Sequence, residues 1–172
     1  MFFKFNFSRL YESMLATSLG PLDIALGEIL LALARGGVYA AGFLIVMACL
    51  GLTLSWTAVL ALPAVLLIAF GFASLGMAVT SLLKTFQQMD LVTLALLPMF
   101  LFSATFFPIS VYPPAVRLLI EVLPLWHGVE LVRGLTTGAL DASMLWHVGY
   151  YLLLVGVGLV VVTRRLRVRF LA

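Results

Sequence analysis

The side chains that could carry out chemistry in this chain are few and widely spaced. His127 and His147 lie 20 residues apart, and Cys49 is the single cysteine, so the spacing does not predict a metal site. Ser110, His127 and Asp141 supply the residue types of a hydrolytic triad, but scattered Ser, His and Asp are common by chance. The sequence has no G-x-x-x-x-G-K-[ST] motif, so we expect no nucleotide site in this chain.

The composition instead indicates a chain that lies in a membrane. Of the 172 residues, 64% are hydrophobic and 10% are charged, whereas soluble domains average about 25% charged residues. A soluble fold of this size could not bury so much apolar surface. This excludes an ordinary soluble domain, a disordered chain and a disulfide-stapled secreted domain. We also find no interleaved basic and aromatic surface of the kind that binds nucleic acid.

Charge-free stretches locate the membrane spans. No charged residue occurs at positions 36–83, 91–116 or 142–163, and a spanning helix needs about 20 apolar residues. The first stretch is long enough for two helices joined by a tight turn, and small residues at 71–78 predict close packing of the second. We therefore expect four transmembrane helices, at about residues 28–50, 57–83, 91–107 and 146–162.

The positive charges predict the orientation of these helices. Lys4 and Arg9 precede the first span, Lys84 lies between the second and third, and four arginines occur in the tail at 164–172. Because lysine and arginine collect on the cytoplasmic side, we expect both termini in the cytoplasm.

Two further segments are amphipathic rather than spanning. Tyr11–Leu19 reads as a short helix that ends at Gly20-Pro21; it either lies on the cytoplasmic leaflet or docks into a soluble partner. In residues 108–145, proline and glycine positions predict two short helices, Pro114–Leu123 and Trp126–Gly134, the second ended by Gly134 and Gly138. Both are too short to span, so we expect interfacial or re-entrant helices at the outer mouth of the bundle.

The fold class expected is thus an all-α membrane protein with one domain over residues 1–172. It comprises a cytoplasmic segment (1–27), three spans (28–107), the outer helices (108–145), the last span (146–163) and a basic tail (164–172).

Three stretches carry a resemblance to a known family. These are YESMLATSLGPLDIALGE at residues 11–28, FLFSATFFP at 100–108 and LPLWHGVELVRGLTTG at 123–138. Together they resemble the permease subunits of type-2 ATP-binding-cassette (ABC) transporters, in the branch that contains nodulation protein J and daunorubicin resistance protein B.

The resemblance implies a dimeric permease of six spans per copy, driven by separate ATPase subunits that bind the ATP; the chain itself would bind no cofactor or metal. The helix at 11–19 would be a coupling helix, and the outer helices would form a re-entrant pair. It implies ATPase docking by Tyr11, Glu12, Leu15, Thr17 and Leu19, and an outer gate at Pro124, His127, Glu130 and Arg133.

The chain departs from the family in the number of spans. It begins where the third family span is about to start, so we expect a fragment, a misassigned start, or half of a split permease whose two other spans come from a separate chain.

The leading hypothesis is an exporter subunit that moves an amphipathic, lipid-linked, glycolipid or drug-like substrate. The alternatives are a four-helix membrane scaffold without transport, or a truncated relic of such a permease.

Overall fold

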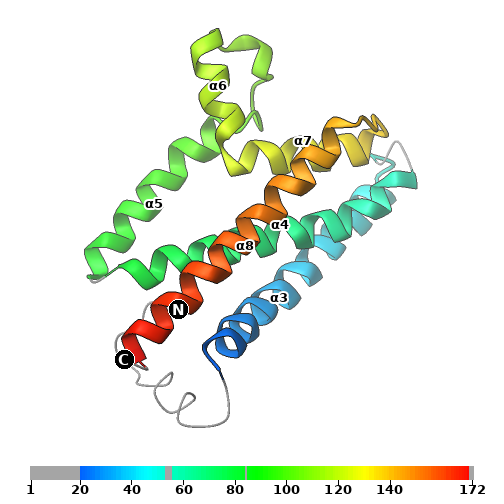
Figure 1. Cartoon of the computed structure of the whole chain (residues 1–172). Coiled ribbons are helices and arrows are strands. Elements are labelled where there is room, and N and C mark those ends of the chain that lie inside the picture. Colours follow the sequence, from blue (N-terminus) through cyan, green and yellow to red (C-terminus); the bar gives the residue numbers. More distant parts are fainter. Residues whose placement is uncertain (1–19, 53–55, 84, 171–172) are drawn as a thin grey trace.

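The chain folds into helices, as Figure 1 shows for a computed structural model that describes residues 20–52, 56–83 and 85–170. No strand occurs within these ranges, which confirms the all-α class. The α-helices are α3 (Pro21–Cys49), α4 (Ala61–Leu82), α5 (Phe86–Leu101), α6 (Pro114–Val122), α7 (Pro124–Thr137) and α8 (Ser143–Phe170). Two short 3-10 helices, η1 (Trp56–Leu60) and η2 (Ile109–Val111), precede α4 and α6.

Three of these segments are long and apolar enough to cross a bilayer. They cover Leu22–Cys49, Trp56–Leu82 and Ser143–Arg165, and they confirm the expected spans at 28–50, 57–83 and 146–162. The chain is therefore an integral membrane protein that crosses the bilayer more than once.

The remaining expected span, at 91–107, differs from the helix in the structure. Helix α5 starts earlier, at Phe86, where Thr85 and Gln88 form a reciprocal capping box. It ends at Leu101, and Ala104 then adopts a left-handed backbone with φ of 59°. At 16 residues, α5 is shorter than the three spans above.

The outer helices lie near the expected positions, and α7 differs from the expectation at both ends. Helix α6 starts at Pro114 as expected, but α7 starts at Pro124, two residues before the expected Trp126, because proline suits the first turn of a helix. The expectation that Gly134 ends the second helix was wrong, because α7 continues to Thr137. Gly138 ends it with φ of 77°, a conformation that glycine adopts without strain.

Helix α4 lies between its neighbours and packs against α3, α7 and α8. Residues near the start of α3 (Ile24, Ala25 and Ile29) form one buried cluster with Met77, Ala78 and Val162. At the opposite end of α4, Ala61 packs against Leu131 and Leu135 of α7. Helix α5 makes few contacts with the other described helices, and Figure 1 shows it separated from them along most of its length.

The outer surface of the bundle is apolar. On α3, the large side chains Val38, Tyr39 and Phe43 are 71%, 71% and 66% exposed. Lipid tails can solvate such surface, whereas water cannot do so without cost, so the exposed faces of α3 fit a bilayer environment.

Close approach of α4 and α8 depends on small residues, as the sequence predicted for residues 71–78. A Cβ atom placed on Gly158 would lie 2.8 Å from the backbone carbonyl carbon of Ser74. The Ser74 hydroxyl is buried and donates within its own helix, to the carbonyl oxygens of Phe70 and Gly71 at 2.9 Å. The two helices can therefore pack backbone against backbone.

This contact predicts different effects for two glycines on one helix. Gly158→Ala should destabilise the fold by about 1–3 kcal/mol, because the new methyl group meets backbone atoms that cannot turn aside. Gly156→Ala should have no such cost, because nothing lies within 4 Å of its added Cβ. Thermal unfolding in detergent, followed by circular dichroism, would measure both; equal stability of the two variants would contradict the packing.

Candidate functional site around helix α7

The four residues expected at an outer gate all lie on α7, and three of them, Pro124, His127 and Arg133, contact other parts of the protein. Pro124 is at the first helical position, and His127, Glu130 and Arg133 follow at spacings of three residues. This spacing places the last three near one side of the helix. Helix α7 is thus a meeting point of α4, α8 and the segment that follows α5.

Tyr151 of α8 forms the deepest of these contacts. The side chain is fully buried, and its hydroxyl donates to the carbonyl oxygen of Pro124 at 2.6 Å. Gly71 of α4 and Gly128 of α7 leave room for the ring: a Cβ on Gly71 would lie 2.6 Å from Tyr151 Cδ1, and one on Gly128 would lie 2.7 Å from the hydroxyl oxygen. The phenol ring therefore occupies a slot lined by two glycines and joins three helices.

A pair of histidines forms the second contact between α7 and α8. The Nδ1 atoms of His127 and His147 are 2.6 Å apart, and both side chains are buried. Tyr150 stacks on the ring of His127 with centroids 3.9 Å apart and donates from its hydroxyl to the carbonyl oxygen of Val122. Burial and the adjacent His147 lower the pKa of His127 to about 4, so the ring is neutral at pH 7.

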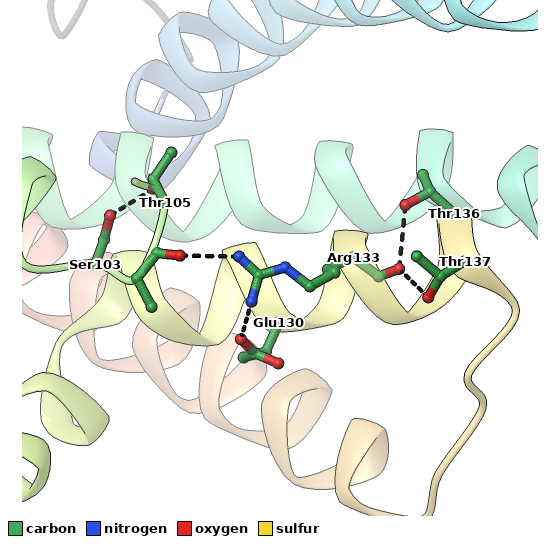
Figure 2. Close-up of polar contacts among 7 residues, drawn as sticks. Ser103, Thr105, Glu130, Arg133, Thr136 and Thr137 are labelled. Atoms are coloured by element: carbon green, nitrogen blue, oxygen red, sulfur yellow. Dashed lines mark hydrogen bonds and ion pairs between the residues drawn. The ribbon is translucent and has the colours of Figure 1, made fainter. Parts of the chain in front are cut away.

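Arg133 joins α7 to the turn after α5, as Figure 2 shows. Its Nη1 pairs with Glu130 Oε1 at 2.7 Å, and its Nη2 donates to the carbonyl oxygen of Ala104 at 2.8 Å. Ala104 is buried in its left-handed conformation, and the flanking Ser103 and Thr105 hydroxyls hydrogen-bond to each other at 2.6 Å. The guanidinium therefore bridges two segments far apart in the sequence.

Threonine hydroxyl groups donate hydrogen bonds to backbone carbonyl oxygens in the C-terminal half of α7. Thr136 and Thr137 both donate to the carbonyl oxygen of Arg133, at 3.1 and 2.8 Å. Thr57 of η1 donates to the carbonyl oxygen of Leu135 at 2.6 Å. The Leu135 carbonyl is one of the last four in α7, which lack intrahelical donors, so the bond from Thr57 satisfies it and places the start of the η1–α4 span against α7.

The structure assigns other partners to the residues considered for a hydrolytic triad. The carbonyl oxygen of Ser110 accepts from Arg117, and the Asp141 carboxylate accepts from Ser143 and from the backbone of Ala142. His127 pairs with His147 instead. Among the described residues, no group of three or more His, Cys, Asp or Glu side chains is placed to hold a metal ion.

The residues expected to dock an ATPase (Tyr11, Glu12, Leu15, Thr17 and Leu19) lie outside the described part of the chain. Conversely, sequence reasoning included Gly71 among the small residues expected at a close helix contact, but it did not identify Tyr151 or the contact between the two histidines. The available signal was the position of His147 just inside the last span, at the same end as α7, but nothing in the spacing specified the contact.

Comparison with known proteins relates the chain to one family. Residues 1–136 match the family model described as ABC-2 type transporter. The chain is 35% identical to nodulation protein J of Rhizobium leguminosarum bv. viciae over 165 residues, which is 95% of this chain and 63% of that protein. It is 38% identical over 134 residues to nodulation protein J of Sinorhizobium fredii, covering 77% of this chain and 51% of the relative. No solved structure matches with significance.

The coverage of the relatives is incomplete. The chain spans 63% of the length of both Rhizobium leguminosarum relatives that it matches, from biovars viciae and trifolii.

The tyrosine slot yields a stability prediction. Tyr151→Phe removes the hydrogen bond to the Pro124 carbonyl and leaves that carbonyl without its donor, at an expected cost of about 1–2 kcal/mol. Tyr39→Phe, at a tyrosine that is 71% exposed, is the matched control and should change little. Chemical unfolding in detergent would compare the two; a Tyr151→Phe chain as stable as the control would show that the slot does not hold the bundle together.

Proposed function

The chain belongs to the ABC-2 type transporter family, and we propose that it is a membrane permease subunit of an ATP-driven exporter. The observation that carries this proposal is the family match over residues 1–136, which includes two of the three apolar spans and nearly all of α7. The work of ATP hydrolysis would be done by a separate ATPase subunit.

We propose that α5 is a fourth crossing and that α6 and α7 lie at the outer mouth. The hydrogen bond from Thr57 to Leu135 sets the start of the η1–α4 span against α7, and the His127–His147 contact sets the start of α8 there as well. Helix α4 then runs away from α7, so α5 must return across the same thickness to reach α6. Both chain termini would lie on the opposite, cytoplasmic side of a bacterial inner membrane.

The coupling of the ATPase to the bundle would run through α3. The proposed docking segment at 11–19 immediately precedes α3, whose first turns pack against α4 and α8 at Ile24, Ala25 and Ile29. A push on that segment would therefore be applied at the cytoplasmic ends of α4 and α8. The opposite ends of these helices hold α7 through Tyr151, His147 and Ala61, so tilting them would move α7 and, through Arg133, the turn after α5.

The substrate proposed is amphipathic: lipid-linked, a glycolipid, or drug-like. Apolar side chains such as Leu91, Leu94 and Leu97 are exposed along α5, and charged groups within the described spans are few. A small hydrophilic ion would find little to replace its hydration there.

The proposed assembly contains an ABC ATPase and a second permease copy. The alternative is a membrane scaffold without transport. It would use the same spans, but it gives no reason for segment 108–138 to pack through α7 against α4 and α8.

Docking is the direct test. Full-length chain purified from native membranes in mild detergent should retain a P-loop ATPase subunit, and Glu12→Lys combined with Leu15→Asp should reduce that recovery at least tenfold. Glu121→Lys, a matched charge reversal on exposed α6 at the other end of the bundle, should leave recovery unchanged. Recovery of an ATPase that is unaffected by the double substitution would contradict the assigned docking residues, and recovery of none would favour the scaffold.

A further inference from the structure

We propose that His127 and His147 form a proton-sensitive latch, which helps to hold α7 against α8 at neutral pH and weakens that contact in acid. The latch depends only on the contact between these two helices. It would therefore exist in a scaffold as well as in a permease, and its test does not depend on transport.

The geometry requires the two rings to share one proton. Two Nδ1 atoms at 2.6 Å can be this close only if one carries a hydrogen and the other offers its lone pair. With both Nδ1 atoms unprotonated the lone pairs repel, and with both protonated two N–H groups face each other. The contact is therefore made by one tautomeric arrangement of a neutral pair or by a pair with a single positive charge.

The surroundings disfavour that positive charge. The ring centroid of Trp126 lies 5.0 Å from that of His127 and 5.3 Å from that of His147. The Trp126 Nε1 is itself buried without an acceptor. The stacked face of Tyr150 offers some attraction for a cation. Removing an imidazolium from water into an aromatic pocket costs more than such contacts return, as the lowered pKa of His127 indicates.

The charged and titratable groups around the pair come from three helices. From α7, the Glu130 carboxylate would attract a positive charge on His147, but this carboxylate is already paired with Arg133. From α6, the backbone of Glu121 acts on His127, and from α8 the neighbours are Tyr150 and Tyr151, whose hydroxyls donate to carbonyl oxygens. None of these groups provides an unshared negative charge that would hold an imidazolium in place.

The direction of the pH effect follows from the proton count. With α7 detached, His127 has its ordinary pKa of 6.5, and with α7 attached the pKa is about 4. Between these two pH values the detached form binds more protons than the attached form. The contribution of the histidine pair to the α7–α8 contact is therefore fully present above pH 6.5, decreases as the pH falls from 6.5 to 4, and does not change further below pH 4. Between pH 7 and pH 5 the opening equilibrium should shift by roughly twentyfold.

Trp126 reports on this contact directly. A full-length chain with Trp56→Phe and Trp146→Phe, in lipid nanodiscs, retains Trp126 as its only tryptophan. Its quenching by acrylamide should increase severalfold between pH 7.5 and pH 4.5, with a midpoint between pH 4 and pH 6.5. Far-UV circular dichroism should stay constant over this range, because α7 separates without unfolding the spans.

Two variants assign the effect to the histidines. His127→Phe combined with His147→Phe fills the same pocket with rings that do not titrate, and it should abolish the pH response of Trp126. Glu130→Gln should retain it, because that carboxylate is not the titrating group. A constant quenching constant in the parent chain, a midpoint outside pH 4–6.5, or a response that persists in the double phenylalanine variant would overturn the latch. The parent titration decides the matter even if the double variant does not fold.

Discussion

The arrangement of the bundle around α7 depends on one buried side chain, Tyr151. Its ring fits between α4 and α7 because residues 71 and 128 are glycines, and its hydroxyl reaches the Pro124 carbonyl at 2.6 Å. A larger residue at either glycine would push α8 away from its neighbours. The histidine pair joins the same two helices, α7 and α8, and the Arg133 bridge connects α7 to the turn after α5. In a bilayer such contacts matter more than apolar burial, because lipid already solvates the outer faces of the helices.

Because lipid solvates the outer faces and specific contacts join the helices, much of the surface is apolar while the residues at the helix contacts are small or polar. Glycine and serine bring α4 and α8 together at Gly158 and Ser74, and threonine side chains donate to carbonyl groups in the last turns of α7. The Arg133 guanidinium donates instead to the Ala104 carbonyl after α5. Helix α5 lacks comparable contacts in the described part of the chain and is connected to α7 chiefly through Arg133 and Ala104. The position of the turn after α5 relative to α7 therefore depends on the hydrogen bond from Arg133 to the Ala104 carbonyl.

The sequence predicted the spans better than it predicted their contacts. Charge-free stretches locate α3, α4 and α8, and Pro114, Pro124 and Gly138 mark the limits of the short helices, because proline and glycine act locally on the backbone. The start of α5 was missed because Asp90 was taken as a boundary, whereas a capped helix continues past it to Phe86. Tyr151 and the histidine contact could not be predicted, since helices that are apolar on all sides carry little information about which face meets a neighbour.

The central claim is that the segment before α3 and the α6–α7 end of the bundle lie on opposite sides of the membrane. Cysteines placed singly at Glu12 and Leu140 in a Cys49→Ser chain test it with a membrane-impermeant maleimide on intact spheroplasts. We expect labelling at position 140 without permeabilisation and at position 12 only after it. Labelling of position 12 from outside, or equal labelling of both positions, would contradict the account.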